Sequence, residues 1–446
     1  MNKFKDDFIF GTATAAYQIE GGFDEGGRTP SIWDTFSKIK GKVYNGHNGD
    51  IACDHYHRYK EDINILKEIG VDSYRLSISW PRIFPSKDEY NQEGIEFYKD
   101  IIKELKEKKI IPAITLYHWD LPQWAQDLGG WENRECVYWF ENFCIKVFEE
   151  LGRDVSLWIT HNEPFCASLL GNYLGIHAPG NSDLKKALMV SHHLLLSHGL
   201  VVRAFRKFKF VSSSIGITLN LSPVYPASTK EEDIFATKIN DGFLNRWFLD
   251  PVLKGSYPKD MIEFYEKIVG SLDFIVAGDL SIISTDMDFL GINYYSSSKI
   301  EYAPDLELKF KGIDGGEEKT AMGWEICPNS LYELLIRIKS EYTKLPLYIT
   351  ENGAAFDDKV TKDNKVHDIE RINFIKDHLV VIQRFIEEGG NLKGYYLWSF
   401  MDNFEWAFGY SKRFGMVYVN YDTQERIMKD SALWYKGVIK TRSLDG

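Results

Sequence analysis

Short apolar runs alternate with longer amphipathic stretches along this chain. Eight runs are rich in β-branched and apolar side chains, and polar turn residues follow each of them: 8–14, 73–80, 111–117, 157–161, 214–221, 289–294, 347–350 and 394–399. Their nearly continuous apolar character is typical of parallel strands that are buried on both faces. We therefore predict eight buried strands.

Apolar residues recur at helical spacing between these runs. In 94–108 they lie at Ile95, Tyr98, Ile101, Ile102 and Leu105, which places them on one face of a helix. The same pattern predicts helices over 61–69, 94–108, 139–151, 184–207, 331–342 and 369–388.

Repeated strand–helix units predict a closed (β/α)8 TIM barrel. We expect one domain over 1–446, since no linker divides the sequence and 311–316 reads only as a surface loop. An open doubly wound sheet is the alternative. It would need a glycine-rich phosphate-binding fingerprint after the first strand, and 11–16 does not supply one.

Polar and aromatic residues gather at the predicted carboxyl ends of the strands. Those ends face the active site in a barrel of this kind. Glu163 follows the fourth strand and Glu351 ends the seventh, so their side chains are expected to face each other across the barrel. Such a carboxyl pair suits glycoside hydrolysis, in which one group protonates the leaving oxygen and the other attacks C1 or activates water.

Composition narrows the classes of partner. A formal net charge of −12 argues against nucleic acid, which needs clustered cations. No apolar stretch reaches the roughly 18 residues of a membrane span, and the acidic opening is not a signal peptide. Five cysteines without a Cys-x-x-Cys pair fit free thiols in a reducing cytoplasm. Twelve Trp offer faces for sugar C–H surfaces.

Two motifs carry a resemblance to a known family. The Thr-His-Asn-Glu-Pro of 160–164 resembles the acid/base motif of family 1 glycoside hydrolases, the β-glucosidase family, and the Thr-Glu-Asn-Gly of 350–353 resembles its nucleophile motif. The runs 10–21, 74–82 and 116–122 are also like the family's, in the family's order. The likeness extends from about residue 5 to about residue 440.

The resemblance implies a retaining β-glucosidase without a cofactor, acting on small β-glucosides and short oligosaccharides such as cellobiose, and also on β-galactosides and β-fucosides. Glu163 would be the acid/base and Glu351 the nucleophile. Arg75 and Tyr295 would hold Glu351, and Asn293 would support the pair. The remaining substrate-binding residues implied are Gln18, His118, Trp119, Asn162, Trp324, Trp398, Glu405, Trp406 and Phe414.

Several alternatives stay open. In the phospho-glycosidase branch a small hydroxyl residue matches Glu405, and we expect an anionic Glu405 to repel a 6-phosphate. A non-catalytic sugar-binding barrel would have lost one Glu. No Gly-x-Ser-x-Gly elbow supports a serine hydrolase, and the His pairs lack the ligand spacing of zinc. The resemblance leaves the oligomeric state open, so a homo-oligomer is possible.

His161 within the acid motif and Cys166 just after it also carry expectations. His161 departs from the apolar residue that often occupies this motif position, and it is expected to alter the pKa of the acid or to shape the aglycone side. Cys166 is expected to pack as a small wall residue of the aglycone site.

Overall fold

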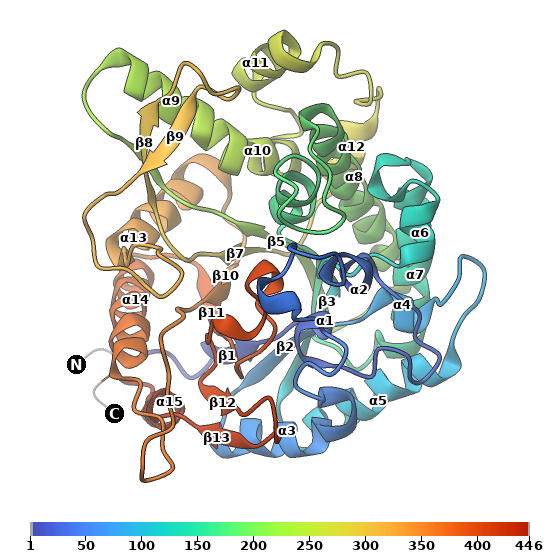
Figure 1. Ribbon diagram of the computed structural model, residues 1–446, viewed down its shortest axis with the longest axis vertical. Helices are drawn as coiled ribbons and strands as arrows, with labels where there is room; N and C mark the ends of the chain where they lie inside the picture. Colours follow the sequence, from blue (N-terminus) through green and yellow to red (C-terminus); the bar gives the residue numbers. More distant parts are fainter. Residues whose placement is uncertain (1–2, 445–446) are drawn as a thin grey trace.

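The centre of the computed structural model, which describes residues 3–444, is a closed barrel of eight parallel strands (Figure 1). The barrel strands are β1 (Ile9–Ala13), β2 (Ser73–Ser77), β3 (Ile111–Tyr117), β4 (Leu157–Asn162), β5 (Ser214–Asn220), β7 (Phe289–Asn293), β10 (Leu347–Asn352) and β11 (Leu392–Trp398). Each barrel strand lies beside those before and after it in the chain. The predicted barrel is confirmed.

Helices lie between the strands and surround the barrel (Figure 1). The six predicted helices correspond to α3 (His55–Ile69), α5 (Gln92–Glu107), α7 (Glu135–Leu151), α8 (Leu184–Phe208), α13 (Pro328–Arg337) and α14 (Ile369–Glu387). The stretch 331–342 is divided, because α13 ends at Arg337 and a π turn, η5 (Ile338–Tyr342), follows. The sequence missed α15 (Asp430–Thr441), which packs against α3 and α14.

The predicted end of the second strand was wrong. The second strand was expected to reach residue 80, but β2 ends at Ser77 and α4 (Trp80–Ile83) begins at Trp80. Pro81 lies in the first turn of α4, where its missing N–H leaves no helix hydrogen bond unmade.

The predicted loop 311–316 was also partly wrong, because it contains the end of β9 (Phe310–Ile313). β9 pairs with β8 (Ser298–Tyr302), and β6 (Val224–Pro226) completes a small sheet. None of the four residues of β9 is buried, so the sequence has no apolar alternation there that would predict a strand.

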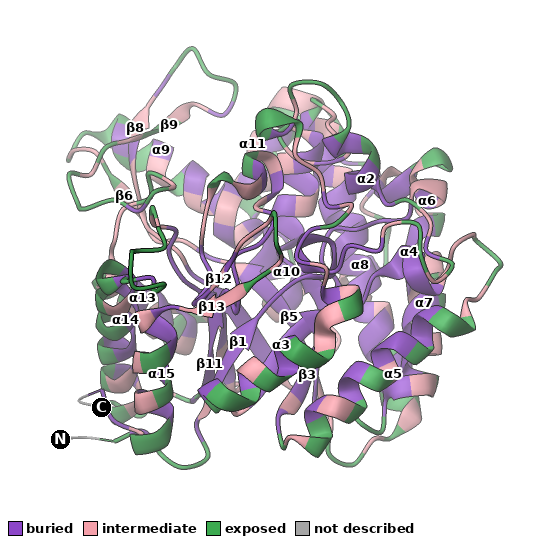
Figure 2. Cartoon of the chain, turned by 60° about the horizontal axis from the view of Figure 1, so that its bottom comes forward, coloured by how far each residue is buried: buried purple, intermediate pink, exposed green. Residues whose placement is uncertain are grey.

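Buried residues concentrate in the barrel strands and on the helix faces that cover them (Figure 2). The helix α8 is long and apolar enough to cross a membrane by length and composition alone. However, 83% of its most apolar window is buried inside the protein, as expected for a core helix. That the chain forms one domain over 1–446 stays a prediction, and residues 1–2 and 445–446 lie outside the described residues.

A buried network of ions fastens the loop that follows β11. Lys429 donates to Asp402 at 2.7 Å and to Asp358 at 2.5 Å, and all three side chains are almost completely buried. Arg371 also binds Asp358, and Arg413 also binds Asp402. The network thereby links the segments after β10 and β11 to the start of α15.

We expect Lys429→Ala to lower the free energy of unfolding by about 3–5 kcal/mol, because the substitution leaves buried carboxylates without their cationic partner. Lys436→Ala is the matched control, since Lys436 is exposed and lies 3.9 Å from Glu68, and its effect should stay within about 0.5 kcal/mol. Guanidinium unfolding followed by circular dichroism measures both. Equal effects of the two substitutions would contradict this role for the network.

Candidate active site

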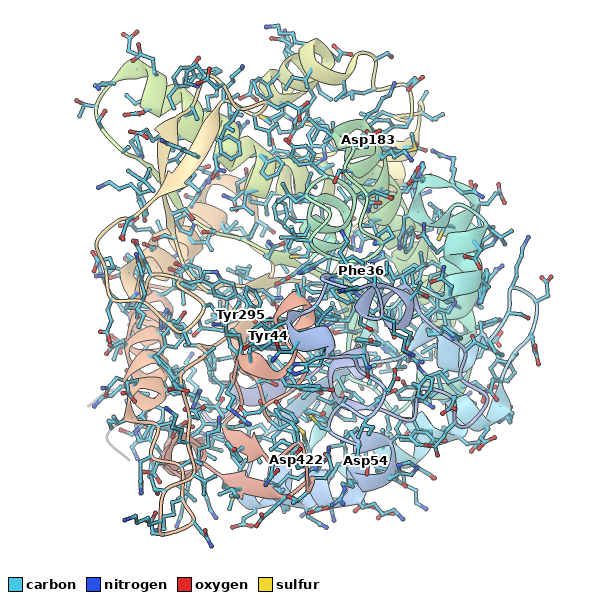
Figure 3. All side chains as sticks on the ribbon, viewed as in Figure 1. Phe36, Tyr44, Asp54, Asp183, Tyr295 and Asp422 are labelled. Carbon is cyan, nitrogen blue, oxygen red and sulfur yellow. The ribbon has the colours of Figure 1, made fainter. Side chains whose placement is uncertain are left out.

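A cavity of about 760 Å³ opens at the carboxyl ends of the barrel strands. Most of the predicted site residues line it: His118, Trp119, Glu163, Asn293, Tyr295, Trp324, Glu351, Trp398, Glu405, Trp406 and Phe414. Tyr295 is labelled near the middle of the molecule in Figure 3. The remaining three, Gln18, Arg75 and Asn162, are buried, and Arg75 and Asn162 hydrogen-bond lining residues directly. The structure therefore brings these residues together around one cavity, except that Gln18 does not line it and instead bonds the Phe404 carbonyl, next to the lining residue Glu405.

Irregular strand pairing precedes both central carboxylates. The register between β10 and β7 shifts between Ile349 and Glu351, and the register between β4 and β5 shifts between Ile159 and Asn162. Shifts of this kind re-aim side chains at the rims of barrels. Glu163 itself adopts a left-handed backbone with φ 48°, one residue beyond the end of β4.

The register shift in β4 also determines where the side chain of His161 lies. Thr160 Oγ1 lies 2.8 Å from His198 Nδ1, and His161 Nε2 lies 2.7 Å from Ser197 Oγ, so both consecutive side chains bond α8. The His161 ring packs against Phe140, and burial holds its pKa well below the usual value. The expectation that His161 shapes the aglycone side was therefore wrong, because its side chain faces the helix layer.

Glu351 is held at both carboxylate oxygens. Arg75 Nη1 donates to Oε1 at 2.7 Å, and the Tyr295 hydroxyl donates to Oε2 at 2.7 Å. The Arg75 side chain is 1% exposed, so this ion pair lies in a medium where charges interact strongly. Arg75 also donates to Thr115 Oγ1 and to the Thr350 carbonyl, which fixes the guanidinium.

The guanidinium sets the polarity of the neighbouring amides, because arginine has no acceptor. Arg75 Nη2 lies 2.7 Å from Asn162 Oδ1, so this atom must be an oxygen that accepts. Asn293 Nδ2 donates to the same oxygen at 3.0 Å and to Glu163 Oε1 at 2.6 Å. Thr350 donates to Asn293 Oδ1, which agrees with this orientation. Oε1 of Glu163 is therefore an acceptor.

The same logic fixes the tautomer of His118. Asn162 Nδ2 is a donor, and it lies 3.0 Å from His118 Nε2, so Nε2 accepts and the ring hydrogen lies on Nδ1. Burial and the charge of Arg75 hold the pKa of His118 well below its usual value, so the ring is neutral. Among residues 3–444 no side chain or backbone group bonds Nδ1, which leaves this N–H to a ligand.

Gln18 presents the opposite polarity. Its Nε2 donates to Asn403 Oδ1 at 3.0 Å and to the Phe404 carbonyl at 2.8 Å, which uses both amide hydrogens. Its Oε1 is buried, and no group in the described part of the chain donates to it. Gln18 therefore offers a free acceptor, whereas His118 offers a free donor.

Three carboxyl groups share the cavity and differ in proton affinity. Burial raises the pKa of Glu163 to about 7, and the charge of Glu351 adds to the rise. Burial raises the pKa of Glu405 to about 8, and both other carboxylates contribute. Burial also raises the pKa of Glu351, but Arg75 and Tyr295 oppose this rise. Glu351 is thus the group best stabilised as an anion.

Aromatic rings form the walls of the cavity. The Trp406 ring lies 4.5 Å from that of Trp119, and His118 stacks on Trp398 at 5.9 Å. Trp324 is 36% exposed at the mouth, where its ring contacts Tyr295 and Phe414. The predicted aromatic residues therefore divide between the interior of the cavity and its entrance.

Sequence reasoning missed much of the outer cavity. Its further lining includes apolar, amide and hydroxyl-bearing side chains: Phe165, Leu170, Ile176, Leu244, Phe408, Asn220, Ser222, Ser296, Ser297 and Ser298. Most lie in loops or in short π and 3-10 turns, where no periodic pattern marks them. Cys166 was expected only to pack, but its Sγ lies 3.1 Å from Glu163 Oε2. The position of Cys166, three residues after Glu163 in the sequence, was the signal that could have predicted this contact.

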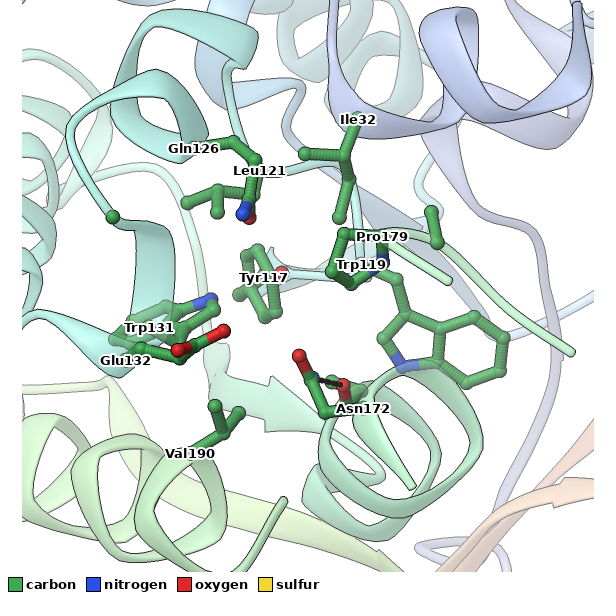
Figure 4. A pocket seen from close by; sticks show the side chains of 13 residues that line it. Ile32, Tyr117, Trp119, Leu121, Gln126, Trp131, Glu132, Asn172, Pro179 and Val190 are labelled. Atoms are coloured by element: carbon green, nitrogen blue, oxygen red, sulfur yellow. Dashed lines mark hydrogen bonds between the residues drawn. The ribbon is translucent and has the colours of Figure 1, made fainter. Parts of the chain in front are cut away.

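A second cavity of about 10 Å³ lies beside Trp119 and is lined by Tyr117, Trp131 and Asn172 among others (Figure 4). It is about the size of one water molecule and is too small for a sugar. Within residues 3–444, no group of three or more His, Cys, Asp and Glu side chains is arranged to hold a metal ion.

Comparisons with known proteins agree with this geometry. The sequence model of Glycosyl hydrolase family 1 matches residues 1–444. Beta-glucosidase A of Acetivibrio thermocellus is 53% identical over 441 residues, which are 98% of each chain. A crystal structure of the beta-glucosidase of Exiguobacterium antarcticum is 54% identical over 99% of both chains, with a TM-score of 0.97.

A third neighbour was solved with a sugar-like inhibitor. The beta-glucosidase of Thermotoga maritima in complex with deoxynojirimycin is 46% identical over 100% of both chains, with a TM-score of 0.95. Family, fold and the two glutamates at the strand ends all agree with the expectation from the sequence. This chain belongs to glycosyl hydrolase family 1 and is a glycoside hydrolase of the β-glucosidase type.

Proposed function

We propose that this enzyme hydrolyses terminal β-D-glucosyl residues with retention, with Glu351 as nucleophile and Glu163 as acid/base. One observation carries the proposal: the network from Arg75 stabilises a charge on Glu351 and makes Oε1 of Glu163 an acceptor. The acid proton then lies on Oε2 of Glu163. Two carboxyl groups in one cavity thereby start in opposite protonation states, as double displacement requires.

In the first step, Glu351 attacks C1 while Glu163 gives its proton to the glycosidic oxygen. The C1–O bond to the aglycone breaks, a C1–O bond to Glu351 forms, and the neutral aglycone leaves. In the second step, Glu163 takes a proton from water as the water oxygen attacks C1, and the bond to Glu351 breaks. After both steps together, Glu351 is ionised and Glu163 is protonated again.

The polar groups around the cavity support glycone binding. His118 Nδ1–H supplies a donor and Gln18 Oε1 supplies an acceptor, which complement sugar hydroxyls. Glu405 is a third hydroxyl partner, and Trp398 and Trp406 supply stacking faces. Asn162 is the contact for the 2-hydroxyl. The binding of deoxynojirimycin by the Thermotoga maritima relative supports a glucose-shaped site.

Trp119 and Phe414 wall the site, and the exposed Trp324 receives the aglycone. The natural substrates would then be cellobiose, short oligosaccharides and aryl or alkyl β-glucosides, and β-galactosides and β-fucosides are expected in addition. A cytoplasmic location, the lack of a cofactor and assembly into a homo-oligomer stay predictions.

A phosphorylated glycone is disfavoured for a different reason from the one expected. Because burial raises the pKa of Glu405 to about 8, Glu405 is largely neutral in the empty cavity and its charge is not the main barrier. Instead, Lys319, which lines the cavity, is already paired with Asp314, and Lys412 donates to the Ala321 carbonyl. A 6-phosphate would lose water and would have to displace these contacts to gain a cation.

The assignment of roles is tested with azide and 4-nitrophenyl β-D-glucoside. Glu351→Gly should lose several orders of magnitude in rate, and azide should restore turnover and give the α-glycosyl azide, because azide then attacks from the vacated face. Glu163→Ala should give the β-glycosyl azide from the covalent intermediate. Glu325→Gln, at the cavity mouth, is the control. If the two variants gave the opposite anomers, or if neither gave a glycosyl azide, the assigned roles would be overturned.

The pH dependence tests the proton on Glu163. Since Glu163 acts as acid only while protonated, kcat/KM for 4-nitrophenyl β-D-glucoside should fall as pH rises above about 7. It should fall again at low pH as Glu351 becomes protonated. A 2,4-dinitrophenyl glucoside needs little proton donation, so its alkaline decline should be much weaker. If the alkaline decline were equally strong for the 2,4-dinitrophenyl glucoside, it would be assigned to the ionisation of Glu405 instead.

The choice of glycone is tested at Glu405. Wild type should cleave 4-nitrophenyl β-D-glucoside and leave its 6-phosphate intact. Glu405→Gln should lower kcat/KM on the glucoside by roughly 2- to 12-fold, since a hydrogen bond between neutral groups contributes about 0.5–1.5 kcal/mol. Preferential cleavage of the 6-phosphate by wild type would replace the proposal with a phospho-glycosidase.

A further inference from the structure

The thiol of Cys166 contacts the carboxyl group that the proposed function assigns as acid/base. Sγ lies 3.1 Å from Glu163 Oε2, within hydrogen-bonding distance for sulfur. Cys166 is 7% exposed and lines the cavity beside Phe165 and Leu170. The contact therefore lies in the reaction chamber rather than in the packed core.

The backbone fixes this contact. The Cys166 N–H donates to the Glu163 carbonyl at 2.9 Å, which closes a tight turn between the two residues. The π turn η3 (Cys166–Leu170) begins at Cys166, and such turns are frequent at functional sites. Because Glu163 enters this turn with φ 48°, the two side chains point into the same part of the cavity.

The polarity of the network makes Oε2 the reacting oxygen. Oε1 accepts from Asn293 Nδ2 at 2.6 Å, so a proton on Glu163 belongs on Oε2. Among residues 3–444, Cys166 is the only side chain that hydrogen-bonds Oε2. The thiol therefore contacts the one oxygen that must lose and regain a proton in each cycle.

We propose that Cys166 is a positioning residue for proton transfer, holding Oε2 of Glu163 toward the leaving group in both protonation states; this inference rests on the proposed function. A thiol is both a weak donor and a weak acceptor. The S–H donates to a lone pair of Oε2 in both states, so that a proton on Oε2 stays free to point toward the leaving oxygen. The hydroxyl of serine has the same two capacities, whereas alanine and valine have neither.

The thiol itself keeps its hydrogen. Burial and the carboxylates of Glu163, Glu351 and Glu405 raise the pKa of Cys166 well above its usual value. The charged and titratable groups that face Glu163 are Glu351 on β10, Arg75 on β2, Glu405 after β11 and Tyr295 after β7. None of them bonds Oε2, so removing the thiol leaves their contacts with Glu163 intact.

The test compares leaving groups in Cys166→Ala, Cys166→Val and Cys166→Ser. Alanine and valine should lower kcat/KM about 5- to 10-fold for methyl β-D-glucoside, which needs a proton donor, and less than about 2-fold for the 2,4-dinitrophenyl glucoside. Serine should stay within about 3-fold of wild type for both substrates. Cys327→Ser, which changes a thiol outside the cavity, is the matched control.

The pH profile supplies a readout that simple packing would not move. The thiol S–H stabilises the ionised form of Glu163, so its loss should raise the pKa of Glu163 and move the alkaline decline upward by roughly 0.3–1 pH unit. Serine should restore the position of the decline. An unmoved decline, or equal losses for both leaving groups, would show that Cys166 only fills space.

Glu163→Ala, measured in parallel, separates two kinds of failure. If kcat/KM of Glu163→Ala falls far more for methyl β-D-glucoside than for the dinitrophenyl substrate while Cys166→Ala behaves as wild type, only the inference about Cys166 is overturned. If kcat/KM of Glu163→Ala falls equally for both substrates, the assignment of the acid is overturned. A melting temperature within a few degrees of wild type identifies a folded variant. If Cys166→Ala is not folded, Cys166→Val takes its place in the comparison.

Discussion

The arrangement of the active site depends on one buried guanidinium that can only donate hydrogen bonds. Arg75 lies inside the barrel and donates to Glu351 and to Asn162. Because it has no acceptor, it determines which end of each neighbouring amide is oxygen. The orientation passes from Asn162 to Asn293 and then to Glu163, so the arginine affects a carboxyl group that it does not bond.

This network requires a closed barrel. Its members come from β2, β4, β7 and β10, which are brought together only when all eight strands pair in order. A buried arginine is costly unless its hydrogen bonds and charge are satisfied. Thr115 and Thr350 satisfy further donors of Arg75, and Glu351 supplies the opposite charge. The fold and the reactive carboxylate therefore stabilise each other.

The fold was largely readable from the sequence because both faces of each barrel strand are buried, which leaves continuous apolar runs. The positions of Glu163 and Glu351 at strand ends followed from the same pattern. The register shifts in β4 and β10 were not readable, since they depend on pairing with other strands. For that reason the sequence left open that His161 shapes the aglycone side, whereas its ring faces α8.

The electrostatics of the cavity distinguishes glutamates that are chemically alike. Glu163, Glu351 and Glu405 share a cavity, and in the described part of the chain only Glu351 of these three forms an ion pair, with Arg75. Ionising all three at once would leave uncompensated charge on buried groups. Glu351 bonds Arg75 and is the most readily ionised, so Glu163 and Glu405 retain protons near neutral pH. Contact with one arginine is thus sufficient to distinguish the proposed nucleophile from the proposed acid.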